Sequence, residues 1–212
     1  GGLGVLFTST GPGAANACGA LVEARFSGST VLHITGQTAR ANVDRGRGTV
    51  HDVPDQLGML KSVSKAAYRV RAPEHTIGIL SQAATEALTS PTGPVSVEIP
   101  IDIQRSLLPR PGGLADFKLP LPTPKQANEK ELDELAKMTL KARRPMLWSG
   151  NGGRHATEEV QRFADMGFGV ITSLAGRGVI PEDHPLVLGC LKDTPRVEDF
   201  LRTADLLIIA GS

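Results

Sequence analysis

Short apolar runs alternate along the chain with segments in which apolar residues recur at helical spacing. The runs Val5–Thr8 and Val31–Thr35 are typical of buried strands. Between them, apolar residues at positions 17, 20, 21 and 24 fall on one face of a helix predicted over Ala14–Arg25. The right-handed crossover of such a strand–helix–strand unit makes its two strands parallel. The pattern therefore predicts an α/β fold built on a parallel sheet.

The same alternation continues toward the end of the chain. Residues 38–56 interrupt it with a polar stretch rich in Arg, Asp and Gly, which predicts a functional or mobile loop. Asn128, with Glu131 three residues later, is typical of a helix N-cap. The further predicted strands are Ala67–Val70, Val95–Ile99, Pro145–Trp148, Val170–Ser173 and Leu206–Ala210, and the further predicted helices are Glu74–Leu88, Asn128–Lys141, Thr157–Met166 and Val197–Arg202.

Prolines divide the chain into two parts. Pro109, Pro111, Pro120, Pro122 and Pro124, together with a Gly-Gly pair, are typical of a stiff and extended linker. We therefore expect a first domain over residues 1–106, a linker over 107–127 and a second domain over 128–212. Each domain is predicted to be a partial three-layer α/β domain around a parallel sheet, and the second is expected to be Rossmann-like. Because core strands lie close to both ends, we expect the chain to be a piece of a longer protein.

Composition excludes several classes of function. A net charge of +1 and an aromatic content of 4% are atypical of nucleic-acid-binding surfaces. No apolar run approaches the ~20 residues of a membrane span, and no signal segment opens the chain. Cys18 and Cys190 are far apart and are expected to be buried free thiols in a reducing cytoplasm. We therefore expect a cytoplasmic protein with neither nucleic-acid nor membrane partners.

Two glycine-containing loops are candidate ligand sites, because open parallel sheets bind ligands beyond the carboxyl ends of their strands. The loop Thr8–Asn16 leads into a helix whose first N–H groups are unpaired, although its glycines would equally suit a tight turn. The loop Ser149–Gly153 resembles a phosphate-binding loop but lacks the pattern G-x-G-x-x-G. Gly176–Gly178 follows the next strand and would either meet the same ligand or form a plain turn.

The first loop also carries a family resemblance. Thr10-Gly11-Pro12-Gly13-Ala14-Ala15-Asn16, followed by His33-Ile34-Thr35-Gly36-Gln37, resembles the pyrimidine-binding domain of thiamine diphosphate enzymes of the acetolactate synthase and benzoylformate decarboxylase type. Residues 64–70 and 92–100 continue the match. Residues 144–146, 149–153 and 176–185 resemble the central domain of the same family.

The resemblance implies roles for individual residues of the first domain. Pro12 would pack on the aminopyrimidine ring of the cofactor, Asn16 would border that ring, and Gly13 would belong to the same cofactor-binding loop. His51 falls where such enzymes often place a Gln or a His near the reactive thiazolium. It would there move protons as a catalytic residue, or it is a solvated loop residue.

Other polar residues of the first domain have more ordinary expected roles. His33 lies in an apolar strand and is expected to be a hydrogen-bonded core histidine. Gln37 is expected to shape the sheet edge, and Glu98 and Asp102 are expected to hold loops near the linker. Lys65 would either line the path by which substrate enters or lie on a solvated face.

Three departures from the family pattern limit what the resemblance implies. The glutamate that protonates the aminopyrimidine and the Gly-Asp-Gly motif that holds the diphosphate and Mg²⁺ have no counterpart here. We therefore expect thiamine diphosphate with Mg²⁺ whose ligands lie outside this segment. Acetolactate synthases that bind FAD use an Arg just before a Pro-Gly-Pro strand, whereas residues 90–94 contain none. FAD is therefore disfavoured.

These expectations give a function and an alternative. The chain is expected to be part of a thiamine diphosphate-dependent 2-oxo acid decarboxylase or carboligase, and to be catalytically incompetent alone. The resemblance implies a homodimer or homotetramer with the active site between subunits, acting on a small 2-oxo acid. The alternative is a non-catalytic nucleotide-binding module that holds an ADP moiety at Ser149–Gly153.

Overall fold

The protein is divided into two compact units, Gly1–Pro124 and Lys125–Ser212. The computed structural model describes residues 2–109, 112, 117–123, 126–190 and 194–212. The division falls inside the predicted linker 107–127, of which 110–111, 113–116 and 124–125 lie outside the described residues. Other parts of that segment pack on the first unit: Leu119 contacts its core and Thr85 Oγ1 donates to the Pro120 carbonyl at 3.0 Å. The described part of the segment that follows the first domain therefore contacts that domain.

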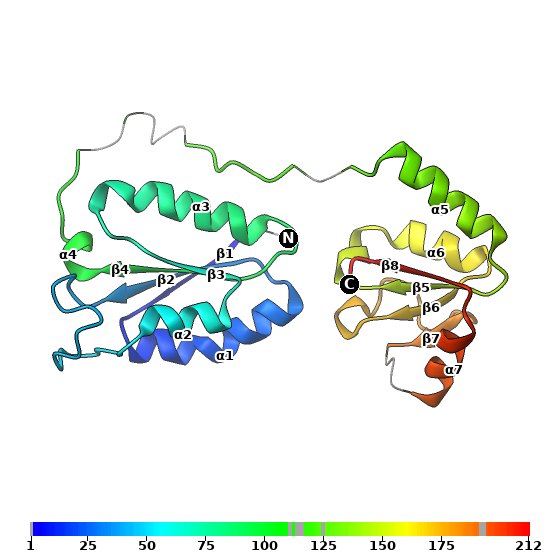
Figure 1. Ribbon diagram of the computed structural model, residues 1–212, viewed down its shortest axis with the longest axis horizontal. Helices are drawn as coiled ribbons and strands as arrows, with labels where there is room; N and C mark the ends of the chain where they lie inside the picture. Colours follow the sequence, from blue (N-terminus) through cyan, green and yellow to red (C-terminus); the bar gives the residue numbers. More distant parts are fainter. Residues whose placement is uncertain (1, 110–111, 113–116, 124–125, 191–193) are drawn as a thin grey trace. The chain divides into compact units, whose positions relative to one another are not determined.

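The first unit is a parallel sheet between two layers of helices. The strand order is β1-β2-β4-β3, and every pairing is parallel. Helix α3 covers one face of the sheet, and helices α1 and α2 cover the other (Figure 1). The elements are β1 Gly4–Thr8, α1 Pro12–Ser27, β2 Val31–Gln37, α2 Gln56–Val63, β3 Ala66–Arg69, a 3₁₀ turn Pro73–His75, α3 Thr76–Leu88, β4 Val95–Pro100 and α4 Ile101–Gln104.

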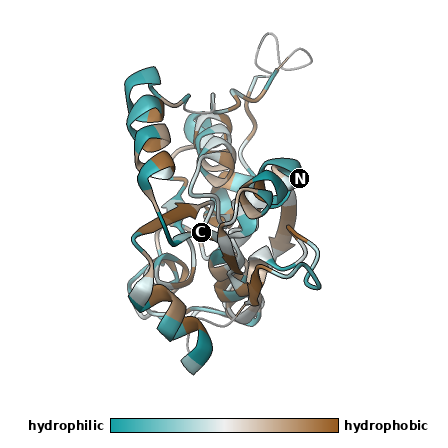
Figure 2. Cartoon of the chain, turned by 90° about the vertical axis from the view of Figure 1, so that its right-hand side faces the viewer, coloured by the Kyte–Doolittle hydropathy of each residue, from teal (hydrophilic) through white to brown (hydrophobic). Residues whose placement is uncertain are grey.

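Apolar side chains fill both interfaces of this sheet. The larger cluster joins β2 and β4 to α3, through residues such as Val95, Val97 and Ala83, which are fully buried. A smaller cluster joins α1 and α2 to β3 through Ala14 and Leu60. Strands of the chain carry the brown of hydrophobic residues in Figure 2, as expected for parallel sheets covered by helices.

The second unit repeats the architecture with a different sequence. The strand order is β7-β6-β5-β8, again wholly parallel. Helices α5 and α6 lie on one side of the sheet and α7 on the other (Figure 1). Its elements are α5 Glu129–Lys141, β5 Pro145–Ser149, a 3₁₀ turn Asn151–His155, α6 Thr157–Asp165, β6 Gly169–Thr172, a 3₁₀ turn Leu174–Gly176, β7 Val187–Gly189, α7 Pro195–Thr203 and β8 Leu206–Ala210.

Most elements match the expectations to within one or two residues, and the mixed α/β fold class is confirmed. The predicted N-cap is also confirmed, because Asn128 Oδ1 accepts from the Lys130 N–H at 2.9 Å. Helix α1 begins two residues earlier than predicted, since Pro12 takes its first position. Helix α2 and strand β7 were not predicted.

Two further expectations concern the burial of the cysteines and membrane-spanning segments. Cys18 and Cys190 are both free, but both are partly exposed, so the expectation that they are buried was wrong. Among the residues that the structure describes, no helix has the length and the apolar character that crossing a bilayer demands.

Candidate functional site

The carboxyl ends of the first unit's strands lie level with one another. Thr8 of β1 is in register with Thr35 of β2, Thr35 with Glu98 of β4, and Glu98 with Arg69 of β3. The loop between β1 and α1 and the long segment 38–55 both leave from this edge, at the left-hand end of the first unit in Figure 1. The sheet therefore brings the predicted cofactor loop and the predicted functional loop to one place.

A glycine with unusual backbone angles forms the turn into α1. Gly11 has φ 60° and ψ −104°, a conformation that costs glycine little and other residues much. A Cβ on Gly11 would lie 2.3 Å from the carbonyl oxygen of His51. The turn therefore needs a glycine both for its angles and because the backbone of segment 38–55 lies against it.

The predicted cofactor-binding residues follow this turn. The Pro12 ring and the Asn16 side chain are exposed, while Gly13 is half-buried, with Ser9 Oγ 2.4 Å from where a Cβ would lie. No side chain caps α1 at its N-terminus. The loop thus offers an apolar ring, an amide and the positive end of a helix dipole to a ligand.

Gln56, at the start of α2, holds the turn from inside. Its Oε1 accepts from the Gly11 N–H at 2.7 Å. Its Nε2 donates to the Gly36 carbonyl at 2.9 Å and to Glu98 Oε2 at 2.9 Å. Gln56 was missed in the sequence, although it lies four residues before the buried Leu60, a spacing that places both on the inner face of α2.

Glu98 is a fully buried carboxylate with several donors around it. Besides Gln56, it accepts from Gln37 Nε2 at 3.2 Å and from Arg69 Nε. Arg69 Nη2 donates in turn to Asp44 Oδ1 in segment 38–55, at 3.1 Å. Gln37 and Glu98 thus have structural roles, but not the expected ones: Gln37 lies on the inner strand β2, and the partners of Glu98 lie in β2, α2 and β3 and not near the linker. Arg69 and Asp44 were not singled out in the sequence.

His33 lies under the site and is fully buried. One ring nitrogen is 2.8 Å from Thr8 Oγ1, and the other is 3.0 Å from Ser96 Oγ, which bonds Ser64 Oγ at 2.7 Å. Burial lowers the pKa of His33 from 6.5 to about 4. His33 is therefore the hydrogen-bonded core histidine that was expected, and it is neutral at pH 7.

The remaining polar expectations have mixed outcomes. Asp102 accepts from Arg40 N at 3.0 Å and from Arg40 Nε at 2.7 Å, which confirms that it holds a loop. Lys65 has a role that neither expectation described: its Nζ donates to the carbonyls of Glu86 and Thr89 at the end of α3, at 2.7 and 2.8 Å. His51 has φ 63°, and its side chain is exposed.

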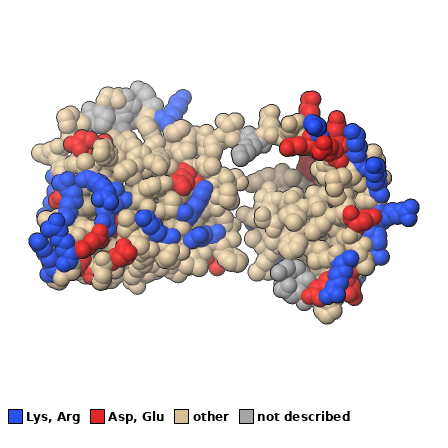
Figure 3. All heavy atoms as spheres, viewed as in Figure 1, with Lys and Arg blue, Asp and Glu red and all other residues tan. Residues whose placement is uncertain are grey.

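Segment 38–55 also gives the site polar atoms and charge. The hydroxyls of Thr38 and Thr49 are buried and have no hydrogen-bond partner within the described structure. Basic side chains gather at the left-hand end of the first unit in Figure 3, over the strand ends and segment 38–55. The exposed arginines of this region are Arg40, Arg45, Arg47, Arg71 and Arg105. Their charge favours anionic ligands.

In the second unit, the loop Ser149–Gly153 is closed by backbone packing. A Cβ on Gly150 would lie 2.2 Å from the Gly211 carbonyl oxygen, and one on Gly176 would lie 2.6 Å from the Ser149 carbonyl oxygen. The Gly150 N–H donates to the Ala210 carbonyl at 2.9 Å. Contacts within the unit thus account for these glycines.

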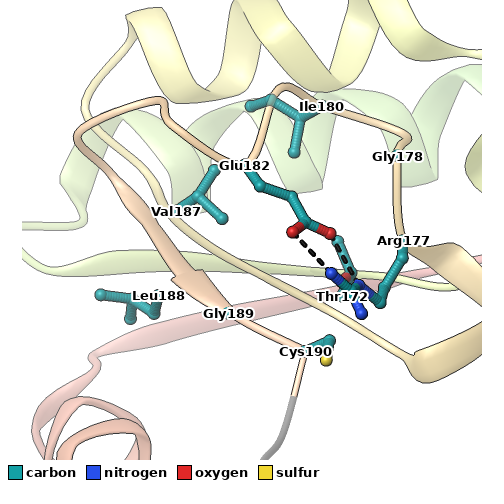
Figure 4. A pocket seen from close by; sticks show the side chains of 9 residues that line it. All are labelled: Thr172, Arg177, Gly178, Ile180, Glu182, Val187, Leu188, Gly189 and Cys190. Carbon is teal, nitrogen blue, oxygen red and sulfur yellow. Dashed lines mark hydrogen bonds and ion pairs between the residues drawn. The ribbon is translucent and has the colours of Figure 1, made fainter.

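A pocket of about 260 Å³ opens beside this loop, beyond the ends of β6 and β7 (Figure 4). Arg177 and Glu182 close one side through two hydrogen bonds of 2.7 Å each, and the Cys190 side chain lies at its rim. The segment Gly176–Gly178 contributes Arg177 and Gly178 to the lining. No group of three or more His, Cys, Asp or Glu side chains suited to a metal occurs among the described residues of either unit.

Two family models match the chain, one in the first half of the first unit and one in the second unit. The model described as "Thiamine pyrophosphate enzyme, N-terminal TPP binding domain" matches residues 1–59. The model described as "Thiamine pyrophosphate enzyme, central domain" matches residues 132–212. The first match contains the Gly11 turn, and the second contains the whole sheet of the second unit.

Individual proteins agree with these matches. The chain is 32% identical over 216 residues to a chloroplastic acetolactate synthase 1 of Zea mays, covering 99% of this chain and 33% of the relative. It is 30% identical to the acetolactate synthase large subunit of Corynebacterium glutamicum, covering 99% and 34%. An X-ray structure from Mycobacterium smegmatis, ascribed to a thiamin diphosphate-dependent enzyme, aligns with TM-score 0.74 and 27% identity, over 98% of this chain and 40% of that one. The chain thus spans about a third of the length of the curated relatives it matches.

Proposed function

Because the chain belongs to the thiamine pyrophosphate enzyme family, we propose that it is the pyrimidine-binding and central part of a 2-oxo acid decarboxylase or carboligase resembling acetolactate synthase. The observation that carries the proposal is the Gly11–Pro12 turn, which is clamped by Gln56 at the carboxyl edge of a parallel sheet. This is where such sheets bind ligands.

The residues at the turn fit the pyrimidine part of thiamine diphosphate (thiamine pyrophosphate). A flat aminopyrimidine has an apolar face and a polar edge. The exposed Pro12 ring suits the face, and the exposed Asn16 amide suits the edge. The buried Thr49 hydroxyl, which has no partner among the described residues, lies two residues before His51, in the segment whose backbone lies against Gly11. Pro12, Gly13 and Asn16 would therefore hold this part of the cofactor.

Roles for this chain in the reaction follow from that fit. The bound cofactor supplies an electron sink for the carbanion that forms when a 2-oxo acid loses carbon dioxide. Pro12 and Asn16 would orient the pyrimidine ring, and the exposed arginines would attract the substrate carboxylate. His51, which is exposed on the segment that packs on Gly11, would move protons as a catalytic residue.

The remaining components of the proposal lie beyond this segment. No Gly-Asp-Gly motif occurs in the sequence, so the Mg²⁺ ligands would come from elsewhere in the polypeptide. Residues 90–94 hold no Arg, which disfavours FAD.

The proposal includes a homodimer or homotetramer with the active site between subunits. The exposure of Pro12, Asn16 and the apolar Val22 and Phe26 of α1 is in line with this. A cytoplasmic location is proposed from composition.

A titration with two probes tests the proposal against the nucleotide-binding alternative. Thiamine diphosphate and ADP are added separately to the isotopically labelled chain, and amide NMR shifts are followed. We expect thiamine diphosphate to shift the amides of Gly11, Gly13 and Asn16. Asn16→Ala should weaken that binding about fivefold, the effect of losing one hydrogen bond.

A matched control and two contrary outcomes make this test decisive. Gln126→Ala also truncates an exposed side-chain amide, but it does so before α5, and it should leave the affinity unchanged. Shifts from ADP at Ser149–Gly153, with none from thiamine diphosphate in the first unit, would favour the nucleotide-binding module. Equal affinities of the Asn16→Ala variant and the unaltered chain would remove Asn16 from the site.

A further inference from the structure

A line of buried polar side chains joins the Gly11 turn to the middle of segment 38–55. It runs from the Gly11 N–H to Gln56, then to Glu98, then to Arg69, and ends at Asp44. Gln56 and Glu98 are fully buried, and the Arg69 side chain is only 11% exposed. The contacts join the β1–α1 turn, α2, β4, β3 and segment 38–55, which are far apart in the sequence.

Along this line, each hydrogen-bond donor faces an acceptor. The Gln56 carbonyl accepts from Gly11, and its amide group serves both Gly36 and Glu98. Glu98 Oε2 accepts from two amides, and its Oε1 accepts from Arg69. Leaving a buried polar group without its partner is costly, and more so if the group is charged. A displacement at one end is therefore opposed at the other.

The two loops also touch directly. The His51 carbonyl occupies the position next to Gly11 that a Cβ would need. Segment 38–55 is thus tied to the turn at two points, by Asp44 through the buried line and by His51 through its backbone. A third tie, between Arg40 and Asp102, holds the same segment to the start of α4 but includes no member of the line to Gly11.

We infer that Gln56 and Glu98 are positioning residues for the Gly11 turn, and that Arg69 and Asp44 couple the position of segment 38–55 to that turn. Ordering of segment 38–55 then favours the observed conformation of the Gly11 turn, and ordering of the turn favours that of the segment. An effect of this coupling on thiamine diphosphate binding rests on the proposed function. The coupling itself is a property of the protein without ligand.

Hydrogen exchange at the Gly11 amide, measured by NMR, tests the inference without any ligand. Gln56→Met keeps the length of the side chain but removes its acceptor, so exchange at Gly11 should rise about tenfold. Asp44→Asn changes only the far end of the line, at a carboxylate that is 47% exposed, and should raise exchange at Gly11 about threefold. The Val97 amide in β4 serves as the reference for global unfolding.

Asp102→Asn is the matched control, because it also loosens an arginine–carboxylate pair that holds segment 38–55. It should leave exchange at Gly11 unchanged. Equal effects of Asp44→Asn and Asp102→Asn at Gly11 would overturn the coupling. Unchanged exchange at Gly11 in Gln56→Met would overturn the positioning role. If exchange responds as expected while thiamine diphosphate fails to bind the unaltered chain, the proposed function fails and this inference stands.

Discussion

Each unit carries a glycine-containing loop after the first strand of its four-stranded parallel sheet, and in both loops a glycine lets backbone pack closely on backbone. The loops differ in the backbone angles of that glycine and in what lies beyond it. In the first unit, Gly11 takes a positive φ and leaves Pro12 and Asn16 exposed beyond it. In the second unit, Gly150 and Gly176 allow backbone to pack on backbone. Both loops combine buried glycines with exposed residues: Pro12 and Asn16 are exposed in the first loop, and Asn151 and Gly152 are exposed in the second.

The polar surroundings of the two loops differ just as clearly. A buried glutamine, glutamate and histidine lie beneath the loop of the first unit and hold it or its strand. Beneath the loop of the second unit, Ser149 Oγ is buried and has no hydrogen-bond partner within the described structure. Buried polar groups are costly unless they are paired. The paired groups of the first unit therefore fix the Gly11 turn, although the Thr38 and Thr49 hydroxyls near it are also buried without a hydrogen-bond partner within the described structure.

The largest expected difference between the units is in their response to acid. The pKa of His33 is about 4 in the folded protein and near 6.5 when unfolded, so protonation favours the unfolded state. Stability from neutral His33 is complete above pH 6.5 and is lost as the pH falls toward 4. The first unit should lose about 3 kcal/mol between pH 7 and pH 4.

Urea unfolding at several pH values checks this expectation. The NMR signals of Tyr68 report on the first unit, and the fluorescence of Trp148 reports on the second; each is the single residue of its type in the chain. The described histidines of the second unit are not buried, so its transition should move less over this range. His33→Gln should flatten the pH dependence of the first unit. A slope that persists in this variant would assign the acid response to other groups.

Much of the fold could be predicted because the parallel strands are continuous apolar runs. The expectation that the first and last strands are buried was wrong, because β1 and β8 are edge strands in which Phe7 and Ile209 are exposed. Strand β8 was predicted with its correct bounds, and most others to within a residue or two. Helix α2 was missed because its eight residues follow directly on the polar segment 38–55 and offer little periodicity. Strand β7 was missed because it has three residues.

The site could be predicted only where it is local in the sequence. The turn with Pro12, Gly13 and Asn16 is one continuous segment, whereas the roles expected for Gln37 and Glu98 were not the ones found. Gln56 pairs with Gly11 across 45 residues and with Glu98 across 42. Residues so far apart in the sequence become neighbours only through the order of the strands in the sheet. The line of hydrogen bonds from Gly11 to Asp44 therefore could not be predicted from the sequence.

A substitution in the second unit sharpens the comparison through packing. An added Cβ at Gly176 would meet the Ser149 carbonyl oxygen at 2.6 Å and Gly150 backbone atoms at about 3 Å, so Gly176→Ala forces the crossing strand-end loops apart. We expect a loss of about 2–3 kcal/mol in the second unit, as for overpacking. Urea unfolding followed by Trp148 fluorescence measures it.

Gly169→Ala is the control in the same unit, because its Cβ would make ordinary contacts of 3.6 and 3.7 Å. It should leave stability unchanged within about 0.5 kcal/mol. A tolerated Gly176→Ala would show that the loop of the second unit can open and does not need this glycine for its packing.

The smallest expected effect comes from the matching change in the first unit. Gly11→Ala places a Cβ 2.3 Å from the His51 carbonyl oxygen and forces alanine into a positive φ, so the exposed backbone segment around His51 must shift away from the turn. We expect a loss of about 1–2 kcal/mol, measured in urea by the signals of Tyr68. Gly19→Ala lies in α1 with open space around its Cβ and should instead stabilise the unit by about 0.5–1 kcal/mol. Opposite signs for these two changes would show that Gly11 is fixed by the His51 contact and its backbone angles; a neutral Gly11→Ala would mean that the turn is no more constrained than an ordinary loop.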